Sequence, residues 1–150
     1  MEISKIKTLS DNIKNNINKI IIGKNSTIDL ILTCILAKGN ILLEDTPGTG
    51  KTMMAKSLAK SLNINFNRIQ FTPDLLPADV IGLSIFNQKD DRFMMQLSLG
   101  YPSYDEELQI LDRFLNNNPI ETINPVCSKK DIVEMQNSIS QVYVHSVIKK

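Results

Sequence analysis

The sequence has few residues that could support disulfide bonding or metal coordination. Its two cysteines, Cys34 and Cys127, lie far apart and form no CxxC pattern. Neither a disulfide framework nor a zinc site is therefore expected, and a reducing compartment fits. His145 is the single histidine, and no acidic or cysteine residue stands at ligand spacing from it, so we expect no metal role for it. No serine or cysteine is paired with a histidine in motif spacing, which leaves a hydrolase triad unsupported.

Excess charge and long apolar runs are also missing. The net charge is +1, which gives no general attraction to nucleic acid or to an anionic membrane. The longest apolar stretch, residues 28–37, is too short to span a bilayer and contains Asp29 and Thr33. The first seven residues contain no apolar segment of the signal-peptide kind. With 150 residues, 42% of them hydrophobic, the chain is expected to be one globular, cytoplasmic domain without nucleic-acid or membrane partners.

The hydrophobic pattern alternates between helical and strand-like segments. Isoleucines and a leucine at spacings of three and four predict a helix from residue 3 to about 20, which Gly23 ends. Ser26 and Asp29 are expected to open a second helix that stops at Gly39. The further expected elements are strands at 40–44, 65–71, 83–86 and 93–99, a helix at about 50–62, and helices capped by Ser103 with Glu106 and by Ser128 with Asp131. This alternation favours an α/β fold.

The most specific motif lies between the first predicted strand and the helix that follows it. The segment reads Asp45-Thr46-Pro47-Gly48-Thr49-Gly50-Lys51-Thr52, which is a phosphate-binding P-loop with aspartate in place of its first glycine. Glycines at these places let backbone N–H groups turn toward phosphate oxygens, and the following helix directs its positive end at the same anion. The lysine is expected to reach the β- and γ-phosphates, and the Thr52 hydroxyl is expected to bind Mg²⁺. The motif therefore predicts a nucleotide-binding site, and ATP with magnesium is the expected ligand.

Together with its surroundings, this loop resembles the MoxR branch of the AAA+ ATPases. The strand and loop at 41–52 are similar to that branch's Walker A region, where aspartate at the position of Asp45 is usual. Residues 66–82, which include Arg68-Ile69-Gln70-Phe71-Thr72-Pro73, are similar to the branch's second strand and following loop. Asp91-Arg92-Phe93 and the segment 97–102 resemble the stretch that leads into a helical lid. The resemblance covers nearly the whole chain and implies a three-layer P-loop core, with an incomplete parallel sheet, at residues 1–102 and part of a helical lid at 103–150.

The resemblance also implies roles for individual residues and for partners. Ile21, Ile22 and Gly23 match the segment that lines the adenine pocket, although they could simply end a helix with core contacts. Arg92 stands where the family carries its arginine finger, which stabilises transition-state charge at a neighbouring subunit, although a solvated arginine at a strand start is an equal alternative. Family members form rings, usually hexamers, act as chaperone-like motors on other proteins, and often pair with proteins that contain von Willebrand factor A domains.

One motif that the family requires is missing from the sequence. A Walker B motif is an apolar strand ending in Asp-Glu, which holds magnesium and positions the attacking water. No run of four apolar residues followed by Asp-Glu occurs here. Residues 83–89 resemble the stretch just before Walker B, whereas Asp91-Arg92-Phe93 resembles the stretch well after it. The third and fourth strands of the family sheet are therefore expected to be absent near positions 89–90, and the lid is expected to stop before the sensor 2 arginine.

This gap has physical consequences for the sheet and for hydrolysis. In the family, the fourth strand lies between the first and the third, and the third pairs with the second. The predicted strand at 65–71 must therefore pair directly with the strand at 40–44 or leave an exposed sheet edge. Magnesium would keep Thr52 but lose its carboxylate. We expect weak or no ATP hydrolysis, even if nucleotide binding survives.

Three functions remain open at this point. The first is a MoxR-type AAA+ module that binds ATP and remodels partner proteins. The second is a non-catalytic remnant that binds ATP or joins the rings of an intact relative, and the missing Walker B motif favours it. The third is a small P-loop kinase, which is disfavoured because the chain has only three arginines, Arg68, Arg92 and Arg113. GTP binding is not expected, since Asn87-Gln88-Lys89-Asp90 does not match the guanine-reading NKxD pattern.

Overall fold

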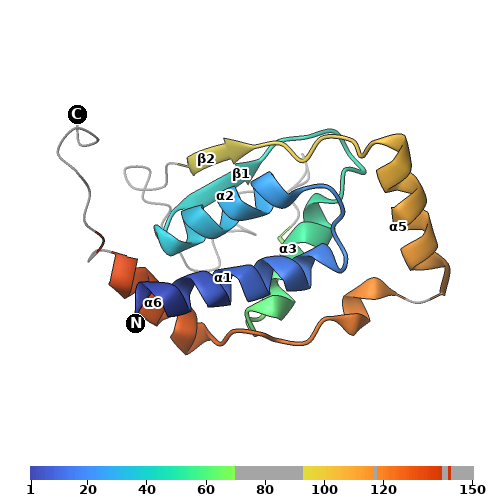
Figure 1. Ribbon diagram of the computed structural model, residues 1–150. Coiled ribbons are helices and arrows are strands. Elements are labelled where there is room, and N and C mark those ends of the chain that lie inside the picture. The colour runs from blue at the N-terminus through green and yellow to red at the C-terminus, as the bar shows by residue number, and fades with distance from the viewer. Residues whose placement is uncertain (70–92, 117, 140–141, 143–150) are drawn as a thin grey trace.

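The computed structural model describes residues 1–69, 93–116, 118–139 and 142. Figure 1 shows helices gathered against two short strands, with one helix standing at the end of the molecule. In chain order the elements are α1 (Ile3–Asn18), α2 (Asn25–Leu36), β1 (Asn40–Leu43), α3 (Lys51–Ser61), β2 (Phe93–Leu97), α5 (Tyr104–Asn116), the 3-10 helix η1 (Pro119–Thr122) and α6 (Lys129–Ile139). None of the helices in the described ranges is long and apolar enough to cross a membrane.

The two strands form a parallel pair, which confirms the incomplete parallel sheet. Ile41 lies opposite Met95 and Leu43 opposite Leu97, after a register shift that follows Asn40. The Glu44 N–H extends the ladder by donating to the Leu97 carbonyl at 3.0 Å. Parallel strands need a long crossover, and here about fifty residues separate the end of β1 from the start of β2. The strand predicted at 93–99 is therefore found, two residues shorter, as the partner of β1.

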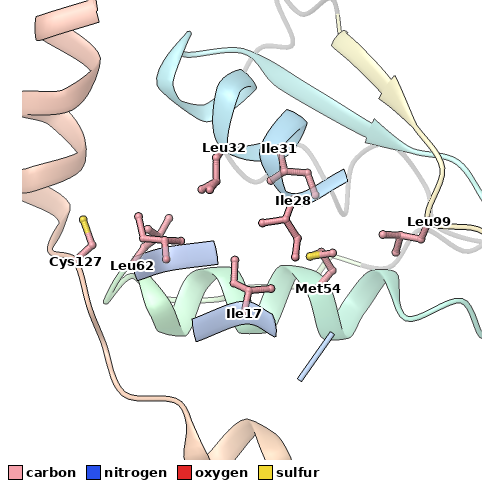
Figure 2. Packing of buried hydrophobic residues seen from close by; sticks show 9 residues of the cluster. Ile17, Ile28, Ile31, Leu32, Met54, Leu62, Leu99 and Cys127 are labelled. Atoms are coloured by element: carbon pink, nitrogen blue, oxygen red, sulfur yellow. The ribbon is translucent and has the colours of Figure 1, made fainter. Parts of the chain in front are cut away.

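Helices α1, α2 and α3 share one hydrophobic core with the sheet. Figure 2 shows side chains from the three helices meeting Leu99 just beyond β2. The buried cluster comprises Ile13, Ile17, Ile28, Ile31, Leu32, Met54, Leu62, Leu99 and Cys127. Ile41, Leu43 and Leu97 pack against it. Residues two apart in a strand point to the same face of the sheet. Ile41 and Leu43 therefore turn one face of the sheet toward the three helices, which cover it.

The segment after α5 returns to this core. Ile123 and Met135 are 0% and 1% exposed. The N–H groups of Val126 and Cys127 both donate to the Ser61 carbonyl at the end of α3, at 3.0 and 3.2 Å. At the other end of the molecule, Gln136 of α6 donates to the Ile35 carbonyl at 2.7 Å. Residues 119–139 are therefore attached to α1, α2 and α3.

A buried asparagine connects three of these parts. Asn16 of α1 is 2% exposed. Its side-chain amide donates to Ser61 Oγ at 3.0 Å and to the Asn124 carbonyl at 2.9 Å. Buried polar groups are costly unless they are hydrogen-bonded, and this amide satisfies acceptors on two other segments. The Asn16 side chain thus connects α1 to the end of α3 and to residues 123–127.

The helix-capping predictions had mixed outcomes. Ser103 with Glu106 and Ser128 with Asp131 form the reciprocal hydrogen bonds of capping boxes, as predicted. The prediction that Ser26 opens α2 is wrong, because α2 begins at Asn25 and its N-cap residue makes no side-chain cap bond. Asp29 instead forms an ion pair with Lys14 of α1 at 2.6 Å.

The strand predicted at 65–71 is not formed at residues 65–69, which run as irregular chain after α3. A strand needs a neighbour to complete its backbone ladder, and in the described parts of the chain β1 pairs with β2 alone. Phe66 instead lies under the Lys56 ammonium, which is 5.9 Å from the ring centroid. The strand predicted at 83–86 lies outside the described residues.

Candidate functional site

The loop between β1 and α3 has the backbone conformation that its glycines predict. Gly48 and Gly50 have φ angles of +92° and +89°, a region that side-chain-bearing residues rarely adopt. A Cβ atom at either glycine would meet no atom within 4 Å, so the space above the loop is open. Gly50 is the N-cap residue of α3, whose first turn contains no acidic side chain. Free N–H groups and the positive end of α3 therefore face an open region suited to an anion.

Lys51 closes over this loop. Its ammonium group donates to the carbonyl oxygens of Asp45 and Thr46 at 2.8 and 2.7 Å, and to Thr49 Oγ1 at 3.4 Å. The two carbonyl oxygens are uncharged acceptors, so a charged phosphate oxygen can replace them as the acceptor for the Lys51 ammonium. The same lysine can therefore hold the loop together before a ligand arrives and bind the ligand afterwards.

Asp45, the residue that replaces the first motif glycine, anchors the loop to the neighbouring strand. One carboxylate oxygen accepts hydrogen bonds from the Ser98 hydroxyl at 3.0 Å and from the N–H groups of Leu99 and Gly100 at 2.5 and 2.9 Å. The Gly100 N–H is the main reason that the pKa of Asp45 lies below its ordinary value; Leu99, Ser98 and the Lys51 charge lower it further, against partial desolvation. The carboxylate therefore stays ionised at neutral pH and fixes the start of the loop to the chain just after β2.

An apolar cavity of about 250 Å³ opens beside the loop. It is lined by Ile20, Ile21, Ile22, Lys24, Gly48, Thr49, Gly50, Met53, Leu99, Gly100, Pro102, Ile110 and Phe114. Its walls thus come from the α1–α2 connection, the loop, the start of α3 and one side of α5. An apolar cleft with a few polar groups at its rim is the usual form of a small-molecule site, and a flat aromatic base suits it.

Close contacts hold α5 against this cavity. Gly23 has a φ of +74°, which is strained for a residue with a side chain, and the Glu106 carboxylate of α5 lies where a Cβ atom of this residue would stand, 1.5 Å from Oε1. Arg113 donates to the Asn18 carbonyl at 2.7 Å, which ties α5 to the end of α1. Thr46 in the loop donates to the Tyr101 hydroxyl at 3.0 Å. The position of α5, and with it one wall of the cavity, is therefore coupled to the loop.

A second, more polar cavity of about 470 Å³ lies on the other side of the loop. It is lined by Pro47, Gly48, Thr49, Gly50, Lys51, Thr52, Met53, Lys56 and Arg68. It shares Gly48, Thr49, Gly50 and Met53 with the apolar cavity. The two cavities therefore meet at the loop, with apolar walls on one side and cationic walls on the other.

The structure brings together most of the residues predicted from the sequence. Residues 45–52 form the loop, and Ile21 and Ile22 line the apolar cavity, whereas Gly23 stands behind it against α5. Arg92 lies outside the described residues. The lining residues that were not predicted as site residues are Ile20, Lys24, Met53, Lys56, Arg68, Leu99, Gly100, Pro102, Ile110 and Phe114. The apolar spacing of Ile110 and Phe114 was a usable signal, while the others come together only through tertiary contacts.

Comparison with known proteins agrees with this geometry. Residues 40–101 match the model of the ATPase family associated with various cellular activities (AAA). The uncharacterized protein YeaC of Bacillus subtilis is 32% identical over 90% of this chain and 66% of its own length. The chaperone MoxR1 of Mycobacterium tuberculosis is 40% identical over 54% of this chain and 22% of its own length. The crystal structure of a "putative ATPase" from Cytophaga hutchinsonii covers 97% of this chain and 68% of its own, with a TM-score of 0.79 at 24% identity.

The parallel strands, the loop between β1 and α3 and the solved structure define an incomplete AAA+ P-loop core. Within that class, the chain is similar to MoxR1 and to the MoxR protein of Paracoccus denitrificans; the latter is 38% identical over 43% of this chain and 19% of its own length. The chain belongs to the MoxR-type AAA+ ATPases. It spans just under two thirds of YeaC and about a fifth of MoxR1.

The alignment with YeaC also bears on the missing segment. It has 210 positions, whereas 90% of this 150-residue chain is 135 residues, so about 75 positions of the alignment hold no residue of this chain. This chain is therefore shorter than the part of YeaC that it matches.

Proposed function

We propose that this chain is a nucleotide-binding module that takes ATP, with the phosphates on the loop at 45–52 and adenine in the apolar cavity. The observation that carries the proposal is the junction of the two cavities at Gly48, Thr49 and Gly50. A ligand that is apolar and flat at one end and polyanionic at the other matches both sides at once. The AAA family match supports the same class of ligand.

Calorimetric titration of the full chain with ATP tests this proposal. Binding is expected, and it is expected to be lost in Lys51→Ala, because that change removes the cation from the loop without touching the core. Lys7→Ala is the matched control, since Lys7 is an exposed lysine of α1 remote from the loop. Equal heats for Lys51→Ala and the unchanged protein would contradict the proposal, as would an absence of heat from well-folded protein.

We further propose that the isolated chain hydrolyses ATP slowly or not at all. The sequence lacks the apolar strand ending in Asp-Glu that would activate water, and the carboxylate of the loop itself, Asp45, accepts hydrogen bonds from residues 98–100. Phosphate release, measured beside that of an intact family member whose ATP hydrolysis has first been demonstrated, tests this. Turnover similar to an intact family member, and abolished by Lys51→Ala, would refute it.

The family role that we propose is assembly into a ring, usually a hexamer, that remodels partner proteins with or without von Willebrand factor A domain proteins. MoxR1 is named a chaperone, and that name supports the role for an intact member. For this chain the proposed role is that of a subunit that joins rings without driving them. Mixing it with an intact family member that hydrolyses ATP should lower that member's nucleotide turnover in proportion to this chain's share of the mixture. Unchanged turnover at a tenfold excess of this chain would rule the role out.

A further inference from the structure

The paired strands β1 and β2 lead into two segments that diverge at Asp45. The backbone ladder reaches the Glu44 N–H, which donates to the Leu97 carbonyl at 3.0 Å. Beyond this bond, one segment turns into the phosphate loop at 45–52, and the other, residues 98–102, runs toward α5. The point where the two segments part is therefore the place that decides how far apart they lie.

These two segments supply different sides of the proposed nucleotide site. Leu99, Gly100 and Pro102 line the apolar cavity. The loop glycines Gly48 and Gly50 line both the apolar and the polar cavity. A nucleotide has a limited reach between its base and its phosphates, so it occupies both cavities at once only if the two segments hold a matching separation.

The Asp45 side chain joins the two segments where they part. Its Oδ2 accepts hydrogen bonds from the Ser98 hydroxyl and from the N–H groups of Leu99 and Gly100. Gly100 has a φ of +64°, and a turn with such a residue lets successive N–H groups converge on one oxygen. Hydrogen bonds to a charged acceptor are stronger than those between neutral groups, so a carboxylate holds this wall of the cavity more firmly than a neutral side chain would.

We propose that Asp45 is a positioning residue for nucleotide binding, which sets the separation between the cavity wall at 98–102 and the phosphate loop. This inference rests on the proposed ATP binding and adds to it the residue that lets one ligand occupy both cavities. Asp45 is not part of the lining of either cavity, so it acts through residues 98–100 and not by touching the ligand. Without its carboxylate, the loop still offers Lys51 and its N–H groups to phosphates, but the base and the phosphates are no longer accommodated together.

The test compares ATP with tripolyphosphate, which carries the phosphates without the base. Both are titrated calorimetrically into the full chain in one buffer that contains MgCl₂, and the ratio of the two affinities is the readout. Asp45→Ala should lower this ratio about tenfold, the equivalent of one hydrogen bond to a charged group, and change the tripolyphosphate affinity by less than about threefold. Asp45→Asn keeps an oxygen that accepts hydrogen bonds, so it should lower the ratio less.

Two further variants separate positioning from charge and from a weaker contact. Glu44→Gln removes the same charge one position earlier, from an exposed side chain that contacts Gln96, and should leave the ratio unchanged because charge acts on both ligands alike. Tyr101→Phe removes the hydrogen bond between Thr46 and the Tyr101 hydroxyl, which joins the same segments. Because both of these side chains are exposed and water competes for them, the ratio should fall less than in Asp45→Ala.

The outcomes separate the inference from the proposed function. An unchanged ratio in Asp45→Ala, with circular dichroism showing folded protein, would overturn the inference and leave ATP binding intact, because Asp45 would then act on stability alone. If that variant does not fold, an unchanged ratio in Asp45→Asn has the same meaning. Falls in Glu44→Gln or Tyr101→Phe as large as that in Asp45→Ala would also contradict the assignment. Failure of the unchanged protein to bind ATP would remove the proposed function and the inference together.

Discussion

Replacing Asn16 with alanine should separate residues 119–139 from the rest of the core. The Asn16 amide is buried and donates to Ser61 Oγ and to the Asn124 carbonyl, at 3.0 and 2.9 Å. Alanine would leave both acceptors without this donor, in surroundings that water reaches poorly. If residues 119–139, within the segment 103–150 that the resemblance assigns to a helical lid, were held only by their other contacts, the same change would cost little.

The magnitude follows from the two lost bonds. A net hydrogen bond contributes about 1 kcal/mol, and each acceptor left unsatisfied in a buried place costs about 1–3 kcal/mol. With two acceptors affected, the expected loss of unfolding free energy is about 2–6 kcal/mol. In a chain of this size, a 3 kcal/mol loss lowers the melting temperature by roughly 6–12 °C.

Urea denaturation followed by circular dichroism measures this loss, and Ser61→Ala completes a double-mutant cycle. Because Asn16 and Ser61 share one bond, the double variant should lose about 1 kcal/mol less than the sum of the single variants. Asn15→Ala, an exposed asparagine on the same helix, is the control and should change the free energy by less than about 0.5 kcal/mol. A loss below about 1 kcal/mol for Asn16→Ala, or additive single variants, would refute this account of the buried contact.

Three further predictions concern the site. Gly23→Ala should weaken ATP binding in calorimetry, because a side chain is strained at a φ of +74° and its methyl group would displace the Glu106 carboxylate from its hydrogen bond to the Ser103 N–H at the start of α5; an unchanged affinity would contradict this role of Gly23. Phe114→Ala should weaken binding of ATP more than that of tripolyphosphate, since Phe114 lines the apolar cavity and not the cationic one, and equal losses would disprove this division. The folded-state pKa of Asp45 is depressed, so its carboxylate adds stability above its ordinary pKa and loses it as the pH falls through the folded value. In Asp45→Asn, the urea midpoint should therefore be lower at pH 7 and fall less between pH 5 and pH 2, and an equal fall would contradict the anchor.

Local sequence accounts for the elements and for the loop itself. The conformation of the loop needs positive φ angles, which its glycines adopt without strain. Two capping boxes form from residues only three positions apart. Such features depend on neighbours within one turn of the chain, so the order of residues is enough to predict them. The failed cap at Ser26 shows the limit: Asp29 lies within reach of its predicted partner but pairs with Lys14 of another helix.

The strand predicted at 65–71 is not formed at residues 65–69, for a related reason. Its residues have a suitable pattern, but strand formation requires a partner, and β1 takes β2 as its partner in the described part of the chain. The choice between these pairings depends on which segments share the core, and hydrophobic periodicity does not contain that information.

The order of residues alone is enough to predict a phosphate-binding loop between a strand and a helix. It also shows the resemblance to MoxR-type AAA+ proteins and the lack of a Walker B motif. Three features are seen only in the tertiary structure. Asp45 anchors this loop to residues 98–100, and α5 closes an apolar cavity beside it. Lys56 and Arg68 border the polar cavity on the phosphate side of the loop. The physical reason is distance along the chain. Asp45 and Gly100 are separated by 55 positions, and a hydrogen bond between them exists only once β1 and β2 have paired.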